Sequence, residues 1–375
     1  MSPEPVLVIG TSVRALAQMA KRAGQPVVAI DAFADCDTRE SALSTSSVAV
    51  DAEYRFAREP LIAAVECAAA RWNPKTAVLA SGFEAAPELI DDIARIVPVA
   101  GNRASSVRRV KEPFALASCL EALGVPHPRT RPELPVDARD WLVKRRGGTG
   151  GGHVRYTPAG GTLLPDEYAQ RRVAGEPVSV LFLADGGQAR LVGANRFWTR
   201  GKESRLPFMF AGAASLSLGA LPFGAEIGAA VAALTATTGL VGLNGVDCLV
   251  AEDRWWLIDV NPRPTATAEL HDGRWAGGLF PAHLAAARGE LSGDARVGVS
   301  DTRGFEIVYA PRLLRIPQDA AWPEWVTDRP RGGSFVAADE PVCTVHAEGN
   351  DLITVRRELA QRATAILGRL TAKAA

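Results

Sequence analysis

The first hundred residues alternate short apolar runs with segments of helical spacing. Apolar runs at 6–10 and 26–31 flank a segment at 11–24 in which apolar residues recur every three or four positions, and the apolar run at 76–84 precedes a second helical segment at 87–96. A strand, a glycine turn, a helix and a second strand form a βαβ unit. We therefore expect a doubly wound α/β sheet, which binds ligands beyond the C-terminal ends of its strands.

The pattern changes near residue 105. The pattern of residues 104–130 predicts a polar segment, then one amphipathic helix and then a segment that contains prolines. Residues 141–154 predict a strand, a glycine-rich hairpin and a second strand, and residues 170–198 predict three further strands. This stretch is typical of a small α+β module.

The remainder of the chain predicts a larger module. An alanine-rich helix is expected at 224–238, followed by two strands and a C-terminal helix at 351–372. A length of 375 residues is too great for one core, since domains usually hold about 100–200 residues. We expect three domains, at 1–105, 106–183 and 184–375.

Composition and charge narrow the classes of protein. Hydrophobic residues make up 47% and charged residues 22%, and 42 basic residues balance 42 acidic ones, so no charge surplus favours nucleic acid or an anionic membrane as a partner. No segment offers about 20 strongly apolar residues, and the N-terminus lacks a basic region of the signal-peptide type. Five dispersed cysteines without a CxxC pair favour reduced thiols. The sequence predicts a soluble, cytoplasmic protein and leaves a homodimer open.

A lysine beside a glycine-rich turn is the first candidate for chemistry. Lys144 ends an apolar strand and precedes five glycines within the six residues 147–152. Glycines allow the backbone to approach a ligand closely, and successive N–H groups with a nearby lysine suit a phosphate. The order of the lysine and the glycines differs from that of a Walker A loop, in which the lysine follows the last glycine. The alternative is a flexible hairpin without a ligand.

Two carboxylates and an amide form the second candidate. Asp247 begins one predicted strand and Asp259 ends the next, so a hairpin between them places the two carboxylates opposite each other. Asn261 follows two residues later and faces the same side. Carboxylate and amide oxygens are ligands that Mg²⁺ prefers, and Arg263 beyond them is placed to meet an anion. The alternative is that Asp259 and Asn261 only begin a turn.

Taken in order, these features resemble the ATP-grasp superfamily. They are Lys111 in VKEPF, Lys144 before the glycines, Q-x-x-V-x-G-E at 170–176 and D-x₁₁-D-x-N-P-R at 247–263. The resemblance runs from about residue 1 to residue 290 and is closest to the branch of ATP-dependent carboligases. The C-terminal RGGSFVAADEPVCTVHAEG also resembles proteins of the biotin carboxylase type.

The resemblance implies a fold and a set of ligand contacts. The fold is α/β: a doubly wound pre-ATP-grasp domain, a small α+β lid domain and a larger domain that clasp ATP. The residues implied to bind ATP are Lys111, Lys144, Gly148, Thr149, Gly150, Gly151, Arg171, Arg172, Val173 and Glu176, of which Arg171–Val173 would read adenine and Glu176 would bind ribose. Asp247, Asp259 and Asn261 would hold Mg²⁺ or Mn²⁺. Lys144 and Arg263 would act catalytically on the phosphoryl group.

Two positions depart from the family's usual pattern. An acid is usual at the adenine hinge, where Gln170, Arg171 and Arg172 stand here, and Glu is more frequent where Asp259 stands. The shorter Asp keeps the charge but reduces its reach toward a metal ion.

The family's chemistry joins a carboxylate to an amine through an acylphosphate, with ADP as a product. The resemblance suggests ligation of an amino acid to an amine in the biosynthesis of a C1-carrier cofactor. Two alternatives are a biotin carboxylase-like enzyme that activates bicarbonate, with a separate carrier, and a non-catalytic ATP-binding scaffold. From the sign of their charges alone, we expect the following residues to contact the small-molecule carboxylate and amine: Arg14, Asp31, Glu84, Arg196 and Glu269.

Overall fold

The first domain is built on a parallel sheet with helices on both faces. The structure, a computed structural model, describes residues 3–157, 161–291, 293–294 and 301–372. The sheet has the order β3-β2-β1-β4 with all neighbours parallel. Its elements are β1 (Val6–Gly10), α1 (Arg14–Arg22), β2 (Val27–Asp31), α2 (Cys36–Ser41), β3 (Ser44–Ser47), α3 (Arg58–Trp72), β4 (Thr76–Leu79) and α4 (Glu88–Ala94). The predicted α/β organisation is confirmed.

Alternation along β1 explains the two helical layers. Val6 and Val8 point into a core shared with α1, whereas Leu7 and Ile9 point into a core shared with α3 and α4. Successive residues of a strand face opposite sides, so a run that is apolar throughout is buried on both.

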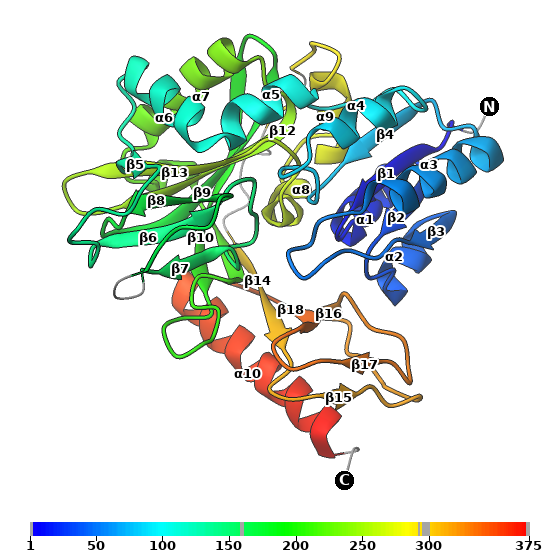
Figure 1. The fold of residues 1–375 in the computed structure, drawn as a ribbon. Helices are drawn as coiled ribbons and strands as arrows, with labels where there is room; N and C mark the ends of the chain where they lie inside the picture. Colours follow the sequence, from blue (N-terminus) through cyan, green and yellow to red (C-terminus); the bar gives the residue numbers. More distant parts are fainter. Residues whose placement is uncertain (1–2, 158–160, 292, 295–300, 373–375) are drawn as a thin grey trace.

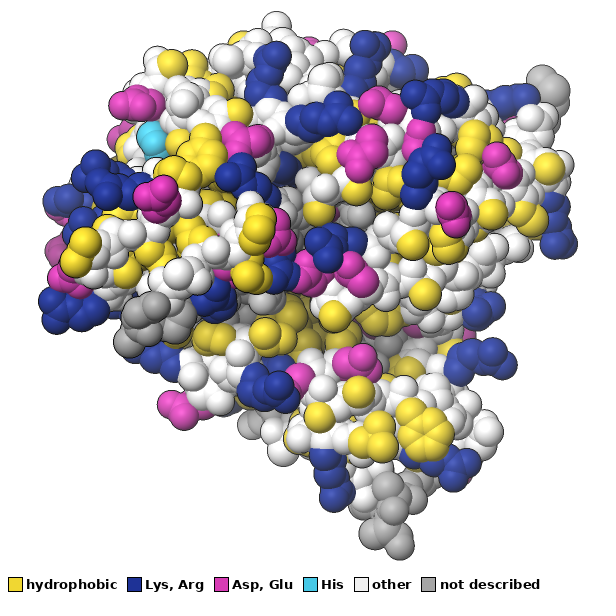
Figure 2. Space-filling model, viewed as in Figure 1, with side chains coloured by type: hydrophobic (Ala, Val, Ile, Leu, Met, Phe, Trp, Pro, Cys, Tyr) yellow, Lys and Arg dark blue, Asp and Glu magenta, His cyan; other side chains and the backbone are white. Residues whose placement is uncertain are grey.

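The second sheet lies at the left of Figure 1, whereas the first sheet lies at the right, and Figure 2 shows basic and acidic side chains intermixed on the surface of both parts. The second sheet has the antiparallel order β5-β8-β6-β7, and the helices α5 and α6 precede it. The elements are α5 (Ala104–Lys111), α6 (Pro113–Ala122), β5 (Thr130–Arg131), β6 (Trp141–Arg145), β7 (Val154–Tyr156) and β8 (Glu167–Arg171). The glycine-rich segment joins β6 to β7, as expected. We call residues 146–153 the glycine hairpin.

One predicted helix is in fact two. The segment 104–130 contains a break at Glu112, which is extended with ψ of 115° between α5 and α6. A residue that precedes a proline is disfavoured in the helical region, and Pro113 suits the first turn of a new helix. The Glu112 side chain accepts the N–H of Ala115 at 2.6 Å and caps that helix. The prediction of a single helix was therefore wrong.

An eight-stranded sheet dominates the rest of the chain. Its order is β13-β12-β9-β10-β11-β14-β18-β16, with antiparallel pairing throughout. Its strands are β9 (Glu176–Asp185), β10 (Ala189–Thr199), β11 (Phe210–Leu216), β12 (Val241–Val250), β13 (Trp255–Asn261), β14 (Thr302–Tyr309), β16 (Val326–Thr327) and β18 (Pro341–Gly349). Because β9 begins at Glu176, this sheet starts before residue 184, where the third domain was expected to begin.

Helices cover this sheet, and a two-stranded sheet lies near the C-terminus. The helices are α7 (Gly224–Thr238), α8 (Glu269–Asp272), α9 (Leu279–Ala286) and α10 (Leu352–Ala372), and the short strands are β15 (Leu314–Arg315) and β17 (Phe335–Val336). Among the described residues, no helix is long and apolar enough to cross a membrane.

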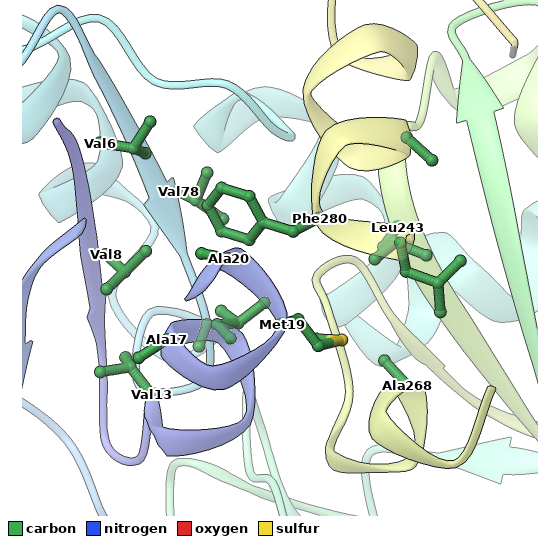
Figure 3. Packing of buried hydrophobic residues seen from close by; sticks show 14 of the residues in the cluster. Val6, Val8, Val13, Ala17, Met19, Ala20, Val78, Leu243, Ala268 and Phe280 are labelled. Atoms are coloured by element: carbon green, nitrogen blue, oxygen red, sulfur yellow. The ribbon is translucent and has the colours of Figure 1, made fainter. Parts of the chain in front are cut away.

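A shared core fixes the first domain to the large sheet. Figure 3 shows Met19 and Ala20 of α1 in the same cluster as Phe280 of α9 and Leu243 of β12. Leu243 and Phe280 are fully buried. Burying a side chain of this size stabilises the folded state by about 1.5–3 kcal/mol. The shared cluster therefore packs α1 against β12 and α9.

Candidate functional site

Two carboxylates face each other across the β12–β13 hairpin. Asp247 pairs with Asp259 and Gly245 pairs with Asn261 in the antiparallel register, with a bulge between Asp247 and Cys248. The Asn261 Nδ2 atom donates to Asp247 Oδ2 at 3.0 Å. The expected juxtaposition of the two carboxylates is confirmed, and the amide lies beside them.

Lys111 reaches this hairpin from the end of α5. Its Nζ atom lies 2.9 Å and 3.0 Å from the two carboxylate oxygens of Asp259. The Lys111 side chain is 4% exposed, against 28% for Asp259. Burial acts to raise the pKa of Asp259, but the charges of Lys111 and Lys144 outweigh it and hold that pKa below its ordinary value. Asp259 therefore stays ionised at neutral pH.

Within the part of the chain that the structure describes, Asp247 forms no ion pair, and its side chain bonds Asn261. Burial raises its pKa to about 6, the charge of Asp259 adds to this shift, and the hydrogen bond from Asn261 opposes it. Among the described residues there is no group of three or more His, Cys, Asp or Glu side chains that could hold a metal. The predicted set differs from such a group, since it has two carboxylates and one amide oxygen. A partly buried carboxylate with a raised pKa fits a divalent cation, which would supply the missing positive charge.

Lys144 is the residue before the last in β6, and its side chain reaches the same hairpin. Its Nζ atom lies 3.1 Å from Gln170 Oε1 and 3.5 Å from the carbonyl oxygen of Ile258. Burial lowers the pKa of Lys144, and the charges of Asp259 and Asp247 oppose that shift. Gln170, which stands where the family more often has an acid, thus bonds the lysine as a neutral acceptor.

The glycine hairpin closes over this arrangement through contacts that only glycine allows. A Cβ atom on Gly148 would lie 2.7 Å from Cβ of His153, and one on Gly151 would lie 2.8 Å from the carbonyl carbon of Phe208. His153 Nδ1 donates to the carbonyl oxygen of Thr149 at 3.3 Å. Burial lowers the pKa of His153 to about 4, and nearby Lys144 contributes to this shift. His153 is therefore neutral at pH 7 and packs as a structural residue.

A cavity lies between the small sheet and the β12–β13 hairpin. It encloses about 490 Å³, including space open to solvent, and both Lys111 and Lys144 line it together with Gly147 and Gly148. Sequence analysis missed its apolar wall, which α6 and β13 supply: Pro113, Leu116, Ala117, Leu120, Leu257 and Ile258. The helical spacing of Pro113, Leu116, Ala117 and Leu120 was the available signal. A cavity lined by both apolar side chains and two lysines suits a ligand that combines an aromatic ring with anionic groups.

Arg263 is held by a residue of the first domain. Its guanidinium forms an ion pair with Glu84, in which the arginine side chain is 15% exposed and the glutamate 3%. The Arg263 Nη2 atom also lies 3.5 Å from Asn261 Oδ1. Burial acts to raise the pKa of Glu84, but Arg263 and Lys111 hold it below its ordinary value. Glu84 thus contacts the site through Arg263.

The residues expected to read adenine, Arg171–Val173, lie at and just beyond the end of β8, and Glu176, expected to bind ribose, begins β9. The N–H groups of Arg171 and Arg172 donate to the carbonyl oxygens of Arg129 and Asp140, at 2.8 Å and 2.7 Å. The described residues that line the cavity include Gln170 but not Arg171–Val173. Glu176 is 69% exposed and pairs with Arg196. The assignment of these residues to ATP, and of Arg196 to substrate, stays a prediction.

The other candidates for substrate contacts form a separate cluster. Arg14 is buried and pairs with both Glu269 and Asp328. Asp31 accepts backbone N–H groups from Val13 at 2.6 Å and from Phe33 and Ala34 at 2.7 Å. Burial raises the pKa of Asp31 to about 6. Arg14 therefore links the first domain to α8 and to the segment after β16, whereas the hydrogen bonds of Asp31 stay within the first domain.

Comparison with known proteins was made for the sequence and for the fold. Residues 110–267 match the family model of the ATP-grasp domain. No curated protein shows significant similarity to the chain.

Solved structures share the fold at low sequence identity. The pyruvate carboxylase of Rhizobium etli has a TM-score of 0.72 at 15% identity over 96% of this chain, which spans 39% of that protein. The biotin carboxylase domain of the 2-oxoglutarate carboxylase of Hydrogenobacter thermophilus, solved as a dimer with MgADP, ADP and bicarbonate, has a TM-score of 0.69 at 11% identity, with 92% and 86% of the two chains covered.

A third structure matches over nearly its whole length. The L-amino acid ligase of Bacillus licheniformis has a TM-score of 0.67 at 12% identity, with 96% of this chain and 97% of that chain covered. The family match and these likenesses confirm the predicted fold class. The chain therefore contains an ATP-grasp domain over residues 110–267 and has the ATP-grasp fold.

Proposed function

We propose that the protein is a Mg-ATP-dependent ligase that activates a carboxylate as an acylphosphate and joins it to an amine. The observation that carries the proposal is the convergence of Lys111, Asp259 and Asp247 at one hairpin, with Arg263 just beyond it, beside a cavity that Lys111, Lys144 and Asp259 line. Two lysines and an arginine around a developing phosphoryl charge stabilise its transfer.

In the first step, a carboxylate oxygen of the substrate attacks the γ-phosphorus of ATP. The bond from that phosphorus to the bridging oxygen breaks, and ADP leaves. Lys111 and Lys144, which line the same cavity, would bind phosphate oxygens of ATP. Asp247, Asp259 and the amide oxygen of Asn261 would hold Mg²⁺, which supplies charge neutralisation for the triphosphate.

In the second step, the amine nitrogen attacks the acyl carbon, and inorganic phosphate leaves with the oxygen of the former carboxylate. The net reaction releases one proton from the amine. Arg263, fixed by Glu84, would stabilise the negative charge on the acylphosphate. The protein contributes positioning and charge, and no side-chain nucleophile is required.

Isotope transfer tests this proposal. An ¹⁸O-labelled carboxylic acid is incubated with enzyme, Mg-ATP and a panel of amines, and the inorganic phosphate formed is analysed by mass. Label in the phosphate supports acylphosphate formation, whereas ADP without label contradicts it. Lys144→Ala serves as the blank.

Bicarbonate alone is included as a substrate, because the fold is shared with a biotin carboxylase domain that was solved with bicarbonate. ADP formation with bicarbonate and no amine would replace the ligase proposal with bicarbonate activation. Nucleotide binding without turnover across the panel would favour the scaffold alternative.

A further inference from the structure

Glu84 is buried and accepts three hydrogen bonds from other groups of the protein. It is 5% exposed and follows β4 in a tight loop of the first domain. Its Oε2 atom accepts the N–H groups of Gly82 and Phe83 at 2.9 Å and 3.0 Å, and its Oε1 atom accepts from Arg263 Nε. The loop's own backbone therefore orients the carboxylate, and the carboxylate orients the guanidinium.

The glycine hairpin touches the same loop. Gly147 has φ of +65°, and a Cβ atom placed on it would lie 2.7 Å from the carbonyl oxygen of Glu84 and 2.8 Å from the nitrogen of Ala85. Backbone atoms cannot move aside as a flexible side chain can, so the hairpin fits against this loop only with a hydrogen at that position. Residues 81–85, which we call the β4 loop, thus contact both the hairpin and Arg263.

A second contact anchors the other end of the hairpin. The N–H of Phe210 donates to the carbonyl oxygen of Gly150 at 2.9 Å. Gly151 lies against the carbonyl group of Phe208. The hairpin therefore contacts the large sheet at Phe210 and the first domain at the β4 loop.

We propose that Glu84 is a positioning residue for Arg263, and that the β4 loop is the surface on which the glycine hairpin closes. This inference rests on the proposed ligase function. Closure of the glycine hairpin over the nucleotide and orientation of the Arg263 guanidinium then both depend on the β4 loop. The substrate carboxylate would therefore meet a correctly oriented Arg263 only when the hairpin is closed. Such coupling prevents water from reaching the phosphoryl group in an incomplete site.

Hydrogen exchange of residues 146–153 tests hairpin closure without any turnover. The probe is a Mg-bound, non-hydrolysable ATP analogue, added at saturation to wild type, Gly147→Ala and Gly150→Ala. The two variants share the backbone strain, with φ of +65° and +66°, but a Cβ on Gly150 meets nothing within 4 Å. We expect Gly147→Ala to lose about tenfold more of the nucleotide-induced protection than Gly150→Ala. Equal loss in both variants would overturn the docking surface.

Steady-state kinetics test the role of Glu84. We expect Glu84→Gln to lower kcat by about tenfold or more while KM for ATP changes less than about twofold, and Glu84→Asp to restore part of the rate. The matched control is Glu88→Gln, since Glu88 is exposed and lies 4.0 Å from Arg108. A raised KM for the carboxylate with unchanged kcat would overturn the positioning role.

Combined variants test the coupling. The double variant Glu84→Gln with Gly147→Ala should show a smaller fold-decrease in kcat than the product of the fold-decreases of the two single variants, because both substitutions act on the β4 loop. Independent losses would contradict the coupling. If wild type forms no ADP at all, the ligase proposal fails, while the exchange experiment still decides whether the hairpin docks on the β4 loop.

Discussion

Asp247 and Asp259 lie directly opposite each other on the β12–β13 hairpin, yet their pKa values shift in opposite directions. Burial acts to raise both. Lys111 contacts Asp259 through both carboxylate oxygens and reverses the effect there, whereas Asp247 has Asn261 as its hydrogen-bond partner among the described residues. One carboxylate of the pair is thus held as an anion by a cation, and the other forms no ion pair among the described residues.

Removing Lys111 should destabilise the protein through Asp259. Lys111→Met leaves a carboxylate without its cation, and we expect a loss of roughly 2 kcal/mol in the free energy of unfolding, below the ~3–5 kcal/mol of fully buried pairs because Asp259 is 28% exposed. The double variant with Asp259→Asn should recover most of that loss. Urea denaturation measures both. Lys75→Met, at an exposed lysine, is the control, and a double variant less stable than Lys111→Met would contradict the argument.

The stability contributed at Asp247 should depend on pH. Its pKa of about 6 in the folded protein exceeds that of an unfolded aspartate, so ionisation of Asp247 destabilises the fold. Below about pH 4 Asp247 is protonated in both the folded and the unfolded state, and the free-energy cost of its ionisation vanishes. Above pH 6 this cost is fully present. Asp247→Asn should therefore stabilise the protein at pH 7.5 and have no effect near pH 4. Urea unfolding across this range measures it, and a gain independent of pH would refute the assignment.

Lys144 should contribute to catalysis more than to folding. Its ammonium group bonds neutral acceptors of Gln170 and Ile258 and lines the cavity with Lys111. Lys144→Ala is expected to lower the ADP-forming rate by about 10²–10³, as for loss of one preorganised donor. Single-turnover measurements at saturating ATP isolate the chemical step. The exposed Lys202→Ala is the control, and a Lys144→Ala rate within twofold of wild type would remove Lys144 from the mechanism.

The sequence predicts the β12–β13 carboxylates well because all the information is local. A turn at Glu252 and Asp253 and the two-residue period of a strand suffice to place Asp247 against Asp259. The break between α5 and α6 could also have been predicted from local sequence, because Pro113 begins the second helix. The helical spacing on both sides of it instead suggested one continuous helix. Local patterns therefore identify a strand or hairpin with its facing side chains.

Contacts between distant segments are beyond such patterns. The ion pair of Glu84 with Arg263 joins residues separated by 179 positions, and no period relates them. Glu84, Arg14 and Glu269 were proposed as substrate contacts from the sign of their charges. The sign of a charge does not identify the group with which a side chain forms an ion pair. The apolar wall from α6 was missed for a related reason, because apolar residues of a helix face either a core or a cavity with the same spacing.

Arg14 should prove to be a stabilising residue of the domain junction. Its side chain is 5% exposed and pairs with Glu269 and Asp328, so Arg14→Met leaves two carboxylates without a cation at a cost of roughly 3–5 kcal/mol. Burial acts to raise the pKa of Asp328, and Arg14 holds it below its ordinary value, so this stability is present above about pH 4 and is lost as the pH falls further. Denaturant unfolding of Arg14→Met and of the exposed control Arg39→Met, at pH 7 and near pH 3, measures the difference. A deficit that stays the same at both values would show that Arg14 acts through packing rather than through charge.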